Sequence, residues 1–474
     1  IADIDGNLWN GTPDLGATTI PDAGSPLSGT IYVGASENYT DLSSAWDALQ
    51  KRGVSGNTIL QLAPGAMNTS LTMGYIPNTL ANSITINGGV SANAPILQKT
   101  ATSEADNYIL KLYNTRNLTL SNLAFSAGNA YYSKAIEMQR YIKDLVIDNC
   151  SFTTPANTHN NYNSAALYTS GAIMDNVQMT NCMIMNLPSG IYISATQQSG
   201  IINGGFLLDG NTFKNVYQGV YLGYLSAPVV SENIIQDHRN MGMNFGSGIS
   251  DLSLLANQVY GNGQYGVRLS YLGSGNHLVA NNYVRTGQNV SSSLYLENSP
   301  NVDMIYNTII NSSSSGSAAA FYQNASSPGL AFTNNLCVAA AGYAAWFNQL
   351  SDFQAGEWTH NLYHSTGVNT VKLGSININN STVWNSNTGD QYSVFADPLL
   401  QDNSFELTAG SPARFAGIIY SGIGQDILGD FRNNPPAIGC RESNFASLDA
   451  PQNVLISVSH ALQTVTLSWD VVPG

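Results

Sequence analysis

The densest group of ionisable side chains in the chain is Asp237-His238-Arg239, which closely follows Glu232. A lyase that acts on an acidic polysaccharide needs such groups. A basic residue removes the proton beside a uronate carboxylate, and a cation, often Ca²⁺ held by carboxylates, stabilises the charge that develops. Arg268 would join the group if its segment faced the same side. A solvated loop with a local ion pair is the simpler interpretation, and we favour it. A thinner group of the same kind comprises Lys134, Glu137, Arg140 and Lys143.

A column of outward side chains is the second candidate site. Five phrases alternate apolar and other residues as a strand does, namely GIYIS (190–194), GVYLG (219–223), GMNFG (242–246), GVRLS (266–270) and SLYLE (293–297). The middle residue of each is predicted to point outward, which gives Tyr192, Tyr221, Asn244, Arg268 and Tyr295, with Glu297 two residues beyond the last. Aromatic faces at a regular rise can bind sugar rings, and amides can bind hydroxyls. The alternative, slightly favoured, is that exposed strands prefer Tyr and that cross-strand Tyr pairs stabilise the sheet.

A longer repeat must position these residues. Alternating apolar residues lead to an Asn in phrases such as LTLSN (118–122), VVSEN (229–233) and AFTNN (331–335). Successive Asn residues lie 22 to 32 positions apart. A period in this range with short strands is the signature of a solenoid with one turn per repeat. The ten residues are Asn122, Asn149, Asn181, Asn211, Asn233, Asn257, Asn282, Asn307, Asn335 and Asn361.

Asn suits the bend of each turn for two reasons. It tolerates the left-handed backbone conformation that a sharp bend requires. Its amide can also donate to the Asn of one neighbouring turn and accept from that of the other, which makes a ladder at the strand spacing. The chain is therefore predicted to be all-β, a right-handed parallel β-helix with two strands per turn and about 11 to 12 turns over residues 57–389.

Both ends of such a coil expose unpaired strand edges, so caps are expected. Residues 28–56 are the predicted N-terminal cap, in which Asp41 begins a helix over residues 41–52 and Gly53 ends it. The apolar positions of that helix share one face, which can lie across the first turn. Residues 390–448 are the predicted C-terminal cap, which contains FADPLL (395–400) and SPA (411–413).

Two segments near opposite ends of the chain share a pattern. DIDGNLWNGTPDLGA (3–17) and DILGDFRNNPPAIGC (426–440) both read D-I-x-G-[N/D]-[L/F]-x-N, followed by Pro and [L/I]-G, at an offset of 423 residues. Residues 1–27 are therefore predicted to be the tail of a preceding unit in a tandem array, or a linker. A chain that begins at Ile1 without an initiator Met or a secretion leader fits an excised piece. The alternative is that the segment docks on a neighbouring molecule and builds head-to-tail fibres.

The end of the chain changes character. Residues 449–474 contain the alternating segments VLISV and VTLSW. They resemble the first two strands of a fibronectin type III module, a sandwich fold that needs about 100 residues to close. The sequence therefore predicts the beginning of such a module after the C-terminal cap.

The stretch SGTIYVGASENYTDLSSAWDALQKRGVSGNTILQLAPGAMN (28–68), together with FADPLL, SPA and DILGDFRNNPPAIG, resembles the opening and closing segments of pectate-lyase-like parallel β-helix proteins on bacterial surfaces. Many are large, modular secreted proteins, often of Bacteroidetes-type bacteria, with fibronectin type III modules. The resemblance covers residues 28–442 and implies an extracellular or cell-surface location. It does not imply one activity, because this fold carries lyases, hydrolases, adhesins and structural fibres. Hydrolases of this fold resemble each other in an adjacent Asp pair and an RxK phrase, which this sequence lacks.

Composition excludes several classes of partner. The net charge of −14 argues against nucleic acid and against an anionic membrane surface. No apolar run approaches the roughly 18 residues of a membrane-spanning helix. Four Cys are too few for a disulfide scaffold, and none forms a zinc-type pair. Cys150 and Cys182 each follow a repeat Asn in consecutive turns, so they are predicted neighbours, either in a disulfide or as buried thiols.

The sequence thus predicts a secreted or cell-surface structural or adhesive protein. It is expected to bind a glycan along the Tyr column and to contact copies of itself or adjacent modules. The alternative is a polysaccharide lyase that uses Asp237, His238 and Arg239 on an acidic polysaccharide. No cofactor is predicted; Ca²⁺ would suit a lyase, but no metal-binding motif indicates it.

Overall fold

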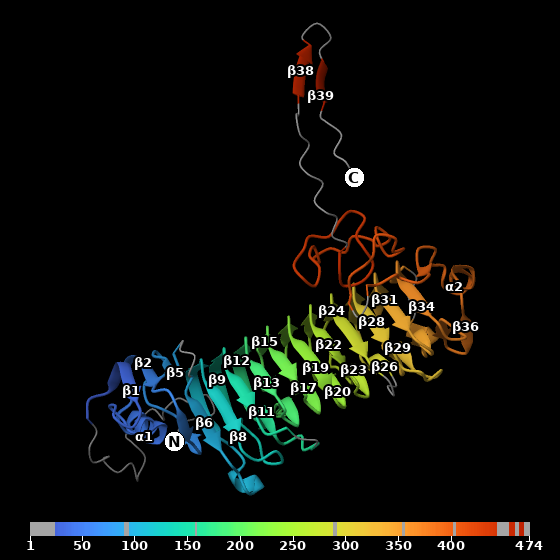
Figure 1. Ribbon diagram of the computed structural model, residues 1–474. Helices are drawn as coiled ribbons and strands as arrows, with labels where there is room; N and C mark the ends of the chain where they lie inside the picture. The colour runs from blue at the N-terminus through green and yellow to red at the C-terminus, as the bar shows by residue number, and fades with distance from the viewer. Residues whose placement is uncertain are drawn as a thin grey trace.

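The computed structural model describes residues 24–89, 94–156, 159–287, 292–352, 356–401 and 404–442, and the backbone of residues 455–459 and 464–468. The chain winds into a parallel β-helix, a coil whose turns stack along one axis (Figure 1). The predicted fold class is confirmed, but each turn has three strands rather than two. The strand that the sequence analysis missed follows the bend directly and has at most five residues, too few to show a clear alternation.

Three sheets run along the coil. The first sheet consists of β4 (Leu71–Met73), β7 (Leu110–Ser121), β9 (Ile136–Asp148), β11 (Ala165–Ser170), β14 (Ser189–Ser194), β17 (Gln218–Gly223), β20 (Met241–Phe245), β23 (Tyr265–Ser270), β26 (Ser292–Glu297), β29 (Ala319–Gln323), β32 (Tyr343–Phe347), β35 (Val371–Leu373) and the antiparallel β36 (Ile376–Ile378). The second sheet shares the long strands β7 and β9 and adds β1 (Leu27–Val33), β2 (Val54–Leu62), β5 (Ile84–Asn87), β12 (Ile173–Thr180), β15 (Leu207–Asp209), β18 (Val229–Ser231), β21 (Ser253–Leu255), β24 (His277–Ala280), β27 (Val302–Ile305), β30 (Ala331–Thr333) and β33 (Trp358–Thr359). The third sheet has 13 strands, namely β3 (Ala66–Asn68), β6 (Ile96–Lys99), β8 (Ala124–Ala127), β10 (Ser151–Thr153), β13 (Met183–Met185), β16 (Thr212–Lys214), β19 (Ile234–His238), β22 (Gln258–Gly261), β25 (Tyr283–Thr286), β28 (Thr308–Asn311), β31 (Leu336–Ala339), β34 (Leu362–Ser365) and β37 (Val394–Phe395).

Seven repeat Asn residues form a buried ladder at the bend between the second and third sheets. The amide Nδ2 of Asn211 donates to Oδ1 of Asn233 at 3.0 Å, and the same bond joins each later pair of turns. The Asn211 amide also donates to the backbone carbonyls of Met179 and Asp209, so it leaves no buried carbonyl at the bend unpaired. The ladder comprises Asn211, Asn233, Asn257, Asn282, Asn307, Asn335 and Asn361.

Asn122, Asn149 and Asn181, which the sequence analysis placed in the same file, occupy the preceding position of their turns. Their backbone is left-handed, with φ between 50° and 57°, and their side chains lie at the surface. In later turns other residues take this position, for example Glu232 with φ 55°. The prediction gave the bend and the ladder to one Asn per turn. The structure divides the two roles between adjacent residues, because one side chain points outward and the next points into the core.

Cys150 and Cys182 occupy the ladder position in the turns before Asn211. The backbone N–H of Cys182 donates to Oδ1 of Asn211 at 2.9 Å, and that of Cys150 donates to the Cys182 Sγ at 3.4 Å. Both thiols are buried and free. Of the two predicted arrangements, the structure therefore has the buried thiol pair.

A helix covers each end of the coil. Helix α1 (Leu42–Arg52) begins after Asp41, whose Oδ1 accepts the N–H of Ser44 at 2.8 Å, and Gly53 ends it with φ 69°. Its buried residues are Leu42, Ala45, Trp46 and Leu49, the face that the sequence predicts. Helix α2 (Ser381–Thr388) lies at the other end, with Trp384 packed against Tyr363 and Phe395. The sequence analysis did not predict α2. The short helices η1 (Glu104–Asp106) and η2 (Leu350–Asp352) lie in loops.

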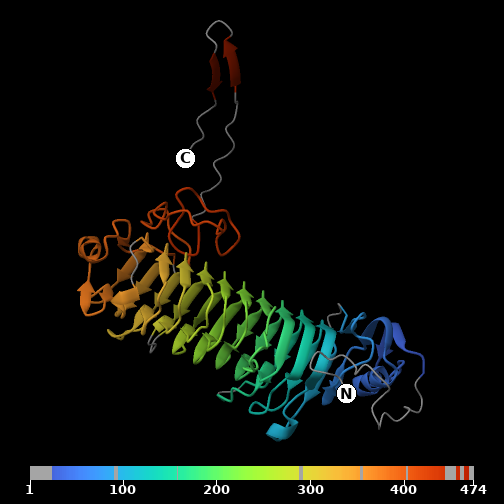
Figure 2. The ribbon, with the colours of Figure 1, turned by 180° about the vertical axis from the view of Figure 1, so that it is seen from behind.

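Residues 404–442, here called the closing segment, lie along the side of the coil, over the bends between the second and third sheets (Figure 2). The hydroxyl of Tyr306 donates to the carbonyl of Ile418 at 2.6 Å, and the Asn281 amide donates to that of Gln425 at 2.8 Å. The closing segment, which lies within the predicted C-terminal cap at 390–448, therefore covers lateral bends of the coil. The end of the coil itself is closed earlier, by β36 and α2.

Beyond the coil, β38 (Leu455–Ser459) and β39 (Thr464–Ser468) form an antiparallel pair. The fibronectin type III module stays a prediction, and residues 1–23 of the predicted N-terminal segment 1–27 lie outside the described residues. Within the part of the chain that the structure describes, no helix is both long and apolar enough to cross a membrane.

Candidate functional site

The first sheet carries an outward column of side chains in continuous register. We call it the aromatic column, and it consists of Tyr168, Tyr192, Tyr221, Asn244, Arg268, Tyr295, Tyr322, Trp346 and Lys372. All five outward residues that the sequence analysis named lie in it. Glu297 lies two residues beyond Tyr295, beside the strand of Arg268.

The rings of the column cover one another's faces. Tyr192 stacks on Tyr168 with centroids 5.5 Å apart and on Tyr221 with centroids 4.7 Å apart, and the planes differ by less than 20°. A ring covered on both faces presents only its edge and its hydroxyl, so the predicted row of open aromatic faces is wrong at Tyr192. The pairing there is the sheet-stabilising alternative. A second block, with centroids 4.7 to 5.7 Å apart, consists of Tyr295, Tyr322 and Trp346.

Cations lie over the outer rings of both blocks. The ammonium of Lys134 is 4.5 Å from the centroid of Tyr168, and Glu104 and Glu137 neutralise it at 2.8 and 3.2 Å. The ammonium of Lys372 lies 3.9 Å from a ring centroid of Trp346. A cation over an aromatic face is attracted by the ring quadrupole. The outer aromatic face at each end of the column is therefore already covered by a cation.

Two rungs without a ring separate the blocks. We call this place the gap site and define it by Tyr221, Asn244, Arg268, Tyr295 and Glu297. Next to Asn244, the free face of Tyr221 has no aromatic partner among the described residues. Its hydroxyl lies beside Gly246, where an added Cβ would be 3.0 Å away, so the absence of a side chain there makes room for the ring. The gap is the one interruption of the stack between Tyr168 and Trp346.

The polar groups of the gap site lie beside this face of Tyr221, and Asn244 is 9% exposed there. Arg268 Nη2 lies 3.3 Å from Glu297 Oε2, and Arg268 Nε is buried without a hydrogen-bond partner. Burial first, and the charge of Glu297 second, raise the pKa of Tyr295 to about 12, so its hydroxyl stays neutral. The site thus combines an aromatic face, an amide, a guanidinium and a carboxylate. These are the groups that bind sugar rings and hydroxyls.

Asp237, His238 and Arg239 do not form one site. The imidazole of His238 is 1% exposed, neither ring nitrogen has a hydrogen-bond partner, and burial lowers its pKa to about 4. Asp237 is exposed at a left-handed bend, and the Arg239 guanidinium lies 5.9 Å from the Tyr217 ring. A bulge in the pairing of β19 with β22 turns His238 into the core. Arg268 belongs to the aromatic column instead.

The thinner group of ionisable residues is also divided. Lys134 and Glu137 pair with each other next to the aromatic column, where Lys111 also contacts Glu137 at 3.3 Å. Arg140 lies at a left-handed bend, and Lys143 pairs with Asp175 at 2.7 Å. Only the first half of this group therefore borders the candidate site.

Two overlapping segments of the chain, residues 108–282 and 175–352, match the family described as right handed beta helix region. Together they span more than half of the chain. The chain belongs to the right-handed β-helix family. No curated protein sequence matches it significantly.

Several solved structures share the fold of this β-helix. One is pectate lyase Pel9A, at 13% identity over 89% of this chain and 98% of that chain, with a TM-score of 0.45. A lacto-N-biosidase of family GH136 from Eubacterium ramulus matches at 12% identity over 73% of this chain, with a TM-score of 0.44, and this chain spans 65% of its length. A mutant of the periplasmic alginate epimerase AlgG matches at 12% identity over 70% and 85% of the two chains, with a TM-score of 0.42. At these identities the likeness concerns the fold alone.

Glu137 and Glu297, which border the two blocks of the column, are too far apart to form a hydrolytic pair with each other. Glu137 and Glu297 border rungs that lie six strands apart, about 29 Å at ~4.8 Å per strand. Paired carboxylates in glycoside hydrolysis are only ~5–9.5 Å apart. Within the described ranges, no cluster of three or more His, Cys, Asp or Glu residues could hold a metal ion.

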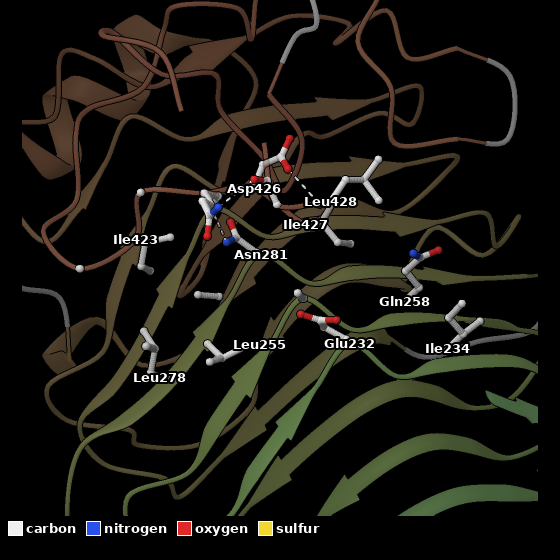
Figure 3. Close-up of a pocket in the computed structure, with 16 residues that line it drawn as sticks. Glu232, Ile234, Leu255, Gln258, Leu278, Asn281, Ile423, Asp426, Ile427 and Leu428 are labelled. Carbon is white, nitrogen blue, oxygen red and sulfur yellow. Dashed lines mark hydrogen bonds between the residues drawn. The ribbon is translucent and has the colours of Figure 1, made fainter. Parts of the chain in front are cut away.

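Glu232, named with the Asp237 group, lines a separate hollow of about 530 Å³ between the closing segment and the bends of the β-helix. Figure 3 shows it on the floor of this hollow, below Leu428 and Asp426. The other labelled lining residues near it are mostly apolar, including Leu255 and Ile423. Glu232 is thus separated from the aromatic column.

The sequence analysis missed four members of the column: Tyr168, Tyr322, Trp346 and Lys372. Three of them stand in the phrases AALYTS (165–170), AAFYQ (319–323) and YAAWF (343–347), where Ala replaces the leading Gly of the pattern. A search that accepted any small residue at that position would have found Tyr168, Tyr322 and Trp346. The strand of Lys372 has three residues, too few for such a pattern.

Proposed function

We propose that this β-helix protein binds a glycan, with one sugar ring seated in the gap site against the open face of Tyr221. The observation that carries the proposal is the interruption of the aromatic column at Asn244 and Arg268. A column that served the sheet alone would gain from a ring at these rungs too. The interruption instead leaves one face of Tyr221 without a ring partner, next to hydrogen-bonding groups.

The surrounding side chains favour a preorganised site. Tyr192 backs Tyr221, and Glu297 holds Arg268, so these side chains lose little freedom when a ligand binds. The guanidinium of Arg268 is already paired with a carboxylate, and the protein carries a net charge of −14. A neutral glycan therefore suits the gap site better than a polyuronate.

The biological role that we propose is structural or adhesive, at the cell surface or outside the cell. A stiff coil with a lateral sugar site and a following module of the fibronectin type III kind would present a glycan-binding surface at a distance. Copies of the protein or adjacent modules are the other proposed partners. The finer assignments of location, module and array rest on the sequence pattern.

Filling the gap tests the glycan-binding proposal. Asn244→Tyr places a ring on the open face of Tyr221 and should reduce affinity at least tenfold in calorimetric titration with a glycan identified on an array. Tyr221→Ala should do the same, because it removes the face itself. Tyr192→Phe is the matched control, since it preserves the stack and should bind normally. A blank array of neutral glycans, or unchanged binding by Asn244→Tyr, would contradict the proposal.

A further inference from the structure

The closing segment is held by Asn side chains at left-handed bends. Asn281 uses both halves of its amide: Nδ2 donates to the carbonyl of Gln425 at 2.8 Å, and Oδ1 accepts from Arg432 Nη2 at 2.6 Å. Asn334 binds the carbonyl and the N–H of Ile418 at 2.8 and 2.9 Å. An amide at this position therefore acts as a clamp for the backbone of a docked segment.

The first residues of the adjoining third-sheet strands also contact the closing segment. We call these residues, together with the Asn residues at the bends, the seat. Tyr283 lies in one apolar cluster with Ile427, and the Thr308 hydroxyl accepts the N–H of Cys440 at 3.0 Å. One turn further on, Leu336 is fully buried in a cluster with Ile438 of the closing segment. Across three successive turns the seat thus offers an apolar ring, a hydroxyl and an aliphatic side chain.

Gly439 shows how closely the segment approaches the coil. A Cβ at this residue would lie 2.7 Å from Thr308 Oγ1 and 3.2 Å from the Leu336 Cβ, and its φ is 101°. Only Gly fits both the conformation and the space.

The N-terminal half of the coil repeats this seat without a described segment on it. Its left-handed bends carry Asn122, Asn149 and Asn181, and the residues two positions later are Ala124, Ser151 and Met183. The order of Asn, hydroxyl and aliphatic side chain is the same as at the closing segment, although each of these Asn amides also donates to the side chain of the preceding turn. A hollow of about 450 Å³ lies over these turns, and Met183 is 47% exposed where Leu336 is 0% exposed. We call this place the N-terminal trough.

Residues 3–17 match the closing segment at the positions that shape it. Asp426 accepts the N–H groups of Leu428 and Asp430, and Gly429 adopts φ 84°; their counterparts are Asp3 and Gly6. These residues form the loop itself, and the N-terminal segment carries the same residue types at the corresponding positions.

The match extends to three of the positions that touch the coil, but not to Arg432, whose counterpart is Trp9. Ile427 is buried, and its counterpart is Ile4. Ile438 and Gly439 lie against Leu336, and their counterparts are Leu15 and Gly16. The match is looser at a position that does not touch the coil. Phe431 is 81% exposed, and its counterpart is a different apolar residue, Leu8.

We propose that residues 3–17 dock in the N-terminal trough as the closing segment docks on the C-terminal bends, with Leu15 over Met183 and the backbone of residue 17 at the Ser151 hydroxyl. The inference does not depend on glycan binding. It gives the N-terminal segment a seat on this coil, and it favours the docking alternative over a segment that serves only a preceding unit.

A disulfide trap tests the contact in the full chain. Leu15→Cys combined with Met183→Cys should form a bond under mild oxidation, detected by mass spectrometry and non-reducing gel electrophoresis. Leu15→Cys with Ser375→Cys, an exposed residue at the other end of the coil, is the control. A bond within a monomer or between two chains supports docking and shows which copy supplies the segment. No bond, or equal bonding in the control, overturns it.

Oxidation of Met183 gives a second measurement that needs no new cysteine. Gly16→Val adds a side chain where its counterpart Gly439 has no room, so it should expose Met183 and speed sulfoxide formation there severalfold. Thr18→Val, outside the matched stretch, should leave the rate unchanged. An unchanged rate in Gly16→Val would overturn the proposal.

Discussion

Tyr192 and Tyr221 stack ring on ring across neighbouring strands, with centroids 4.7 Å apart and planes 17° apart. The pair lies on the outer surface of the first sheet, where one side chain per turn is held at the strand spacing. One ring is covered on both faces and the other on one face only. This difference distinguishes a Tyr that stabilises the sheet from a Tyr that can receive a ligand.

The stack should contribute measurably to stability. Tyr192→Ala removes two ring contacts and is expected to lower the free energy of unfolding by about 1–3 kcal/mol, given ~0.5–1.5 kcal/mol per aromatic pair. Tyr192→Phe keeps the stack and should cost little. Chemical denaturation of both variants measures the difference, and equal stabilities would refute a stabilising stack.

The buried Asn ladder should be far more sensitive than the surface Asn residues. Asn257→Ala strips the donor from the carbonyls of Val230 and Leu255 and interrupts the ladder on both sides. We expect a loss of about 2–4 kcal/mol, because each buried group left unpaired costs ~1–3 kcal/mol.

Asn149→Gly is the control for the ladder, since Gly keeps the left-handed backbone of this position without strain. It occurs at a comparable bend but removes a surface amide whose bond goes to Asn122. Its cost in the same denaturation experiment should be clearly smaller. Comparable losses for both variants would mean that burial does not set the strength of the ladder.

His238 should make the protein less stable in mild acid. Burial lowers its folded-state pKa to about 4, below the ~6.5 of an unfolded chain. The unfolded chain therefore takes up a proton first as the pH falls. Stability is full above pH ~6.5 and should decline by about 3 kcal/mol between pH 6.5 and 4.

His238→Leu isolates this contribution. Burial also lowers the pKa values of His277 and His360, so both of these remain in the variant and act in the same direction. Unfolding free energies measured across this pH window should show a shallower slope for His238→Leu. Equal slopes of unfolding free energy against pH for the two proteins would show that other groups cause the acid sensitivity.

The lyase alternative has a direct assay. Asp237, His238 and Arg239 point to different environments, so we expect no absorbance from an unsaturated product when the protein is incubated with uronate-containing polysaccharides. Activity that appears and is abolished by Arg239→Ala would reverse this assignment. Arg140→Ala, at an unrelated bend, is the control for nonspecific loss of charge.

The coil was predictable because its signal is repeated. The Asn at each bend follows alternating apolar residues, and ten occurrences outweigh the ambiguity of any one. The two roles of Asn could not be separated in the same way. Whether Asn181 or its neighbour Cys182 points inward depends on which residue takes the left-handed conformation, and both readings fit the spacing.

The sequence predicted which residues of the candidate site share one face of the sheet, but not which faces of their side chains are covered. Spacing placed Tyr192, Tyr221, Asn244, Arg268 and Tyr295 on one face. Ring orientation is set by side-chain torsions and by the neighbouring turn, so the covered face of Tyr192 and the open face of Tyr221 look alike in the sequence. The burial of His238 was not foreseen for a related reason: a single bulge before it reverses the direction of its side chain.

The elements that cover the two ends of the coil limit how the molecule can assemble. Strand β36 runs against β35, and α1 contacts β1 and β2 at the opposite terminus, so in the described part of the chain the ends of the first and second sheets are covered. The length of each rod is thereby fixed by its own polypeptide. Longer filaments must arise from units joined in one chain or from contacts along the flanks.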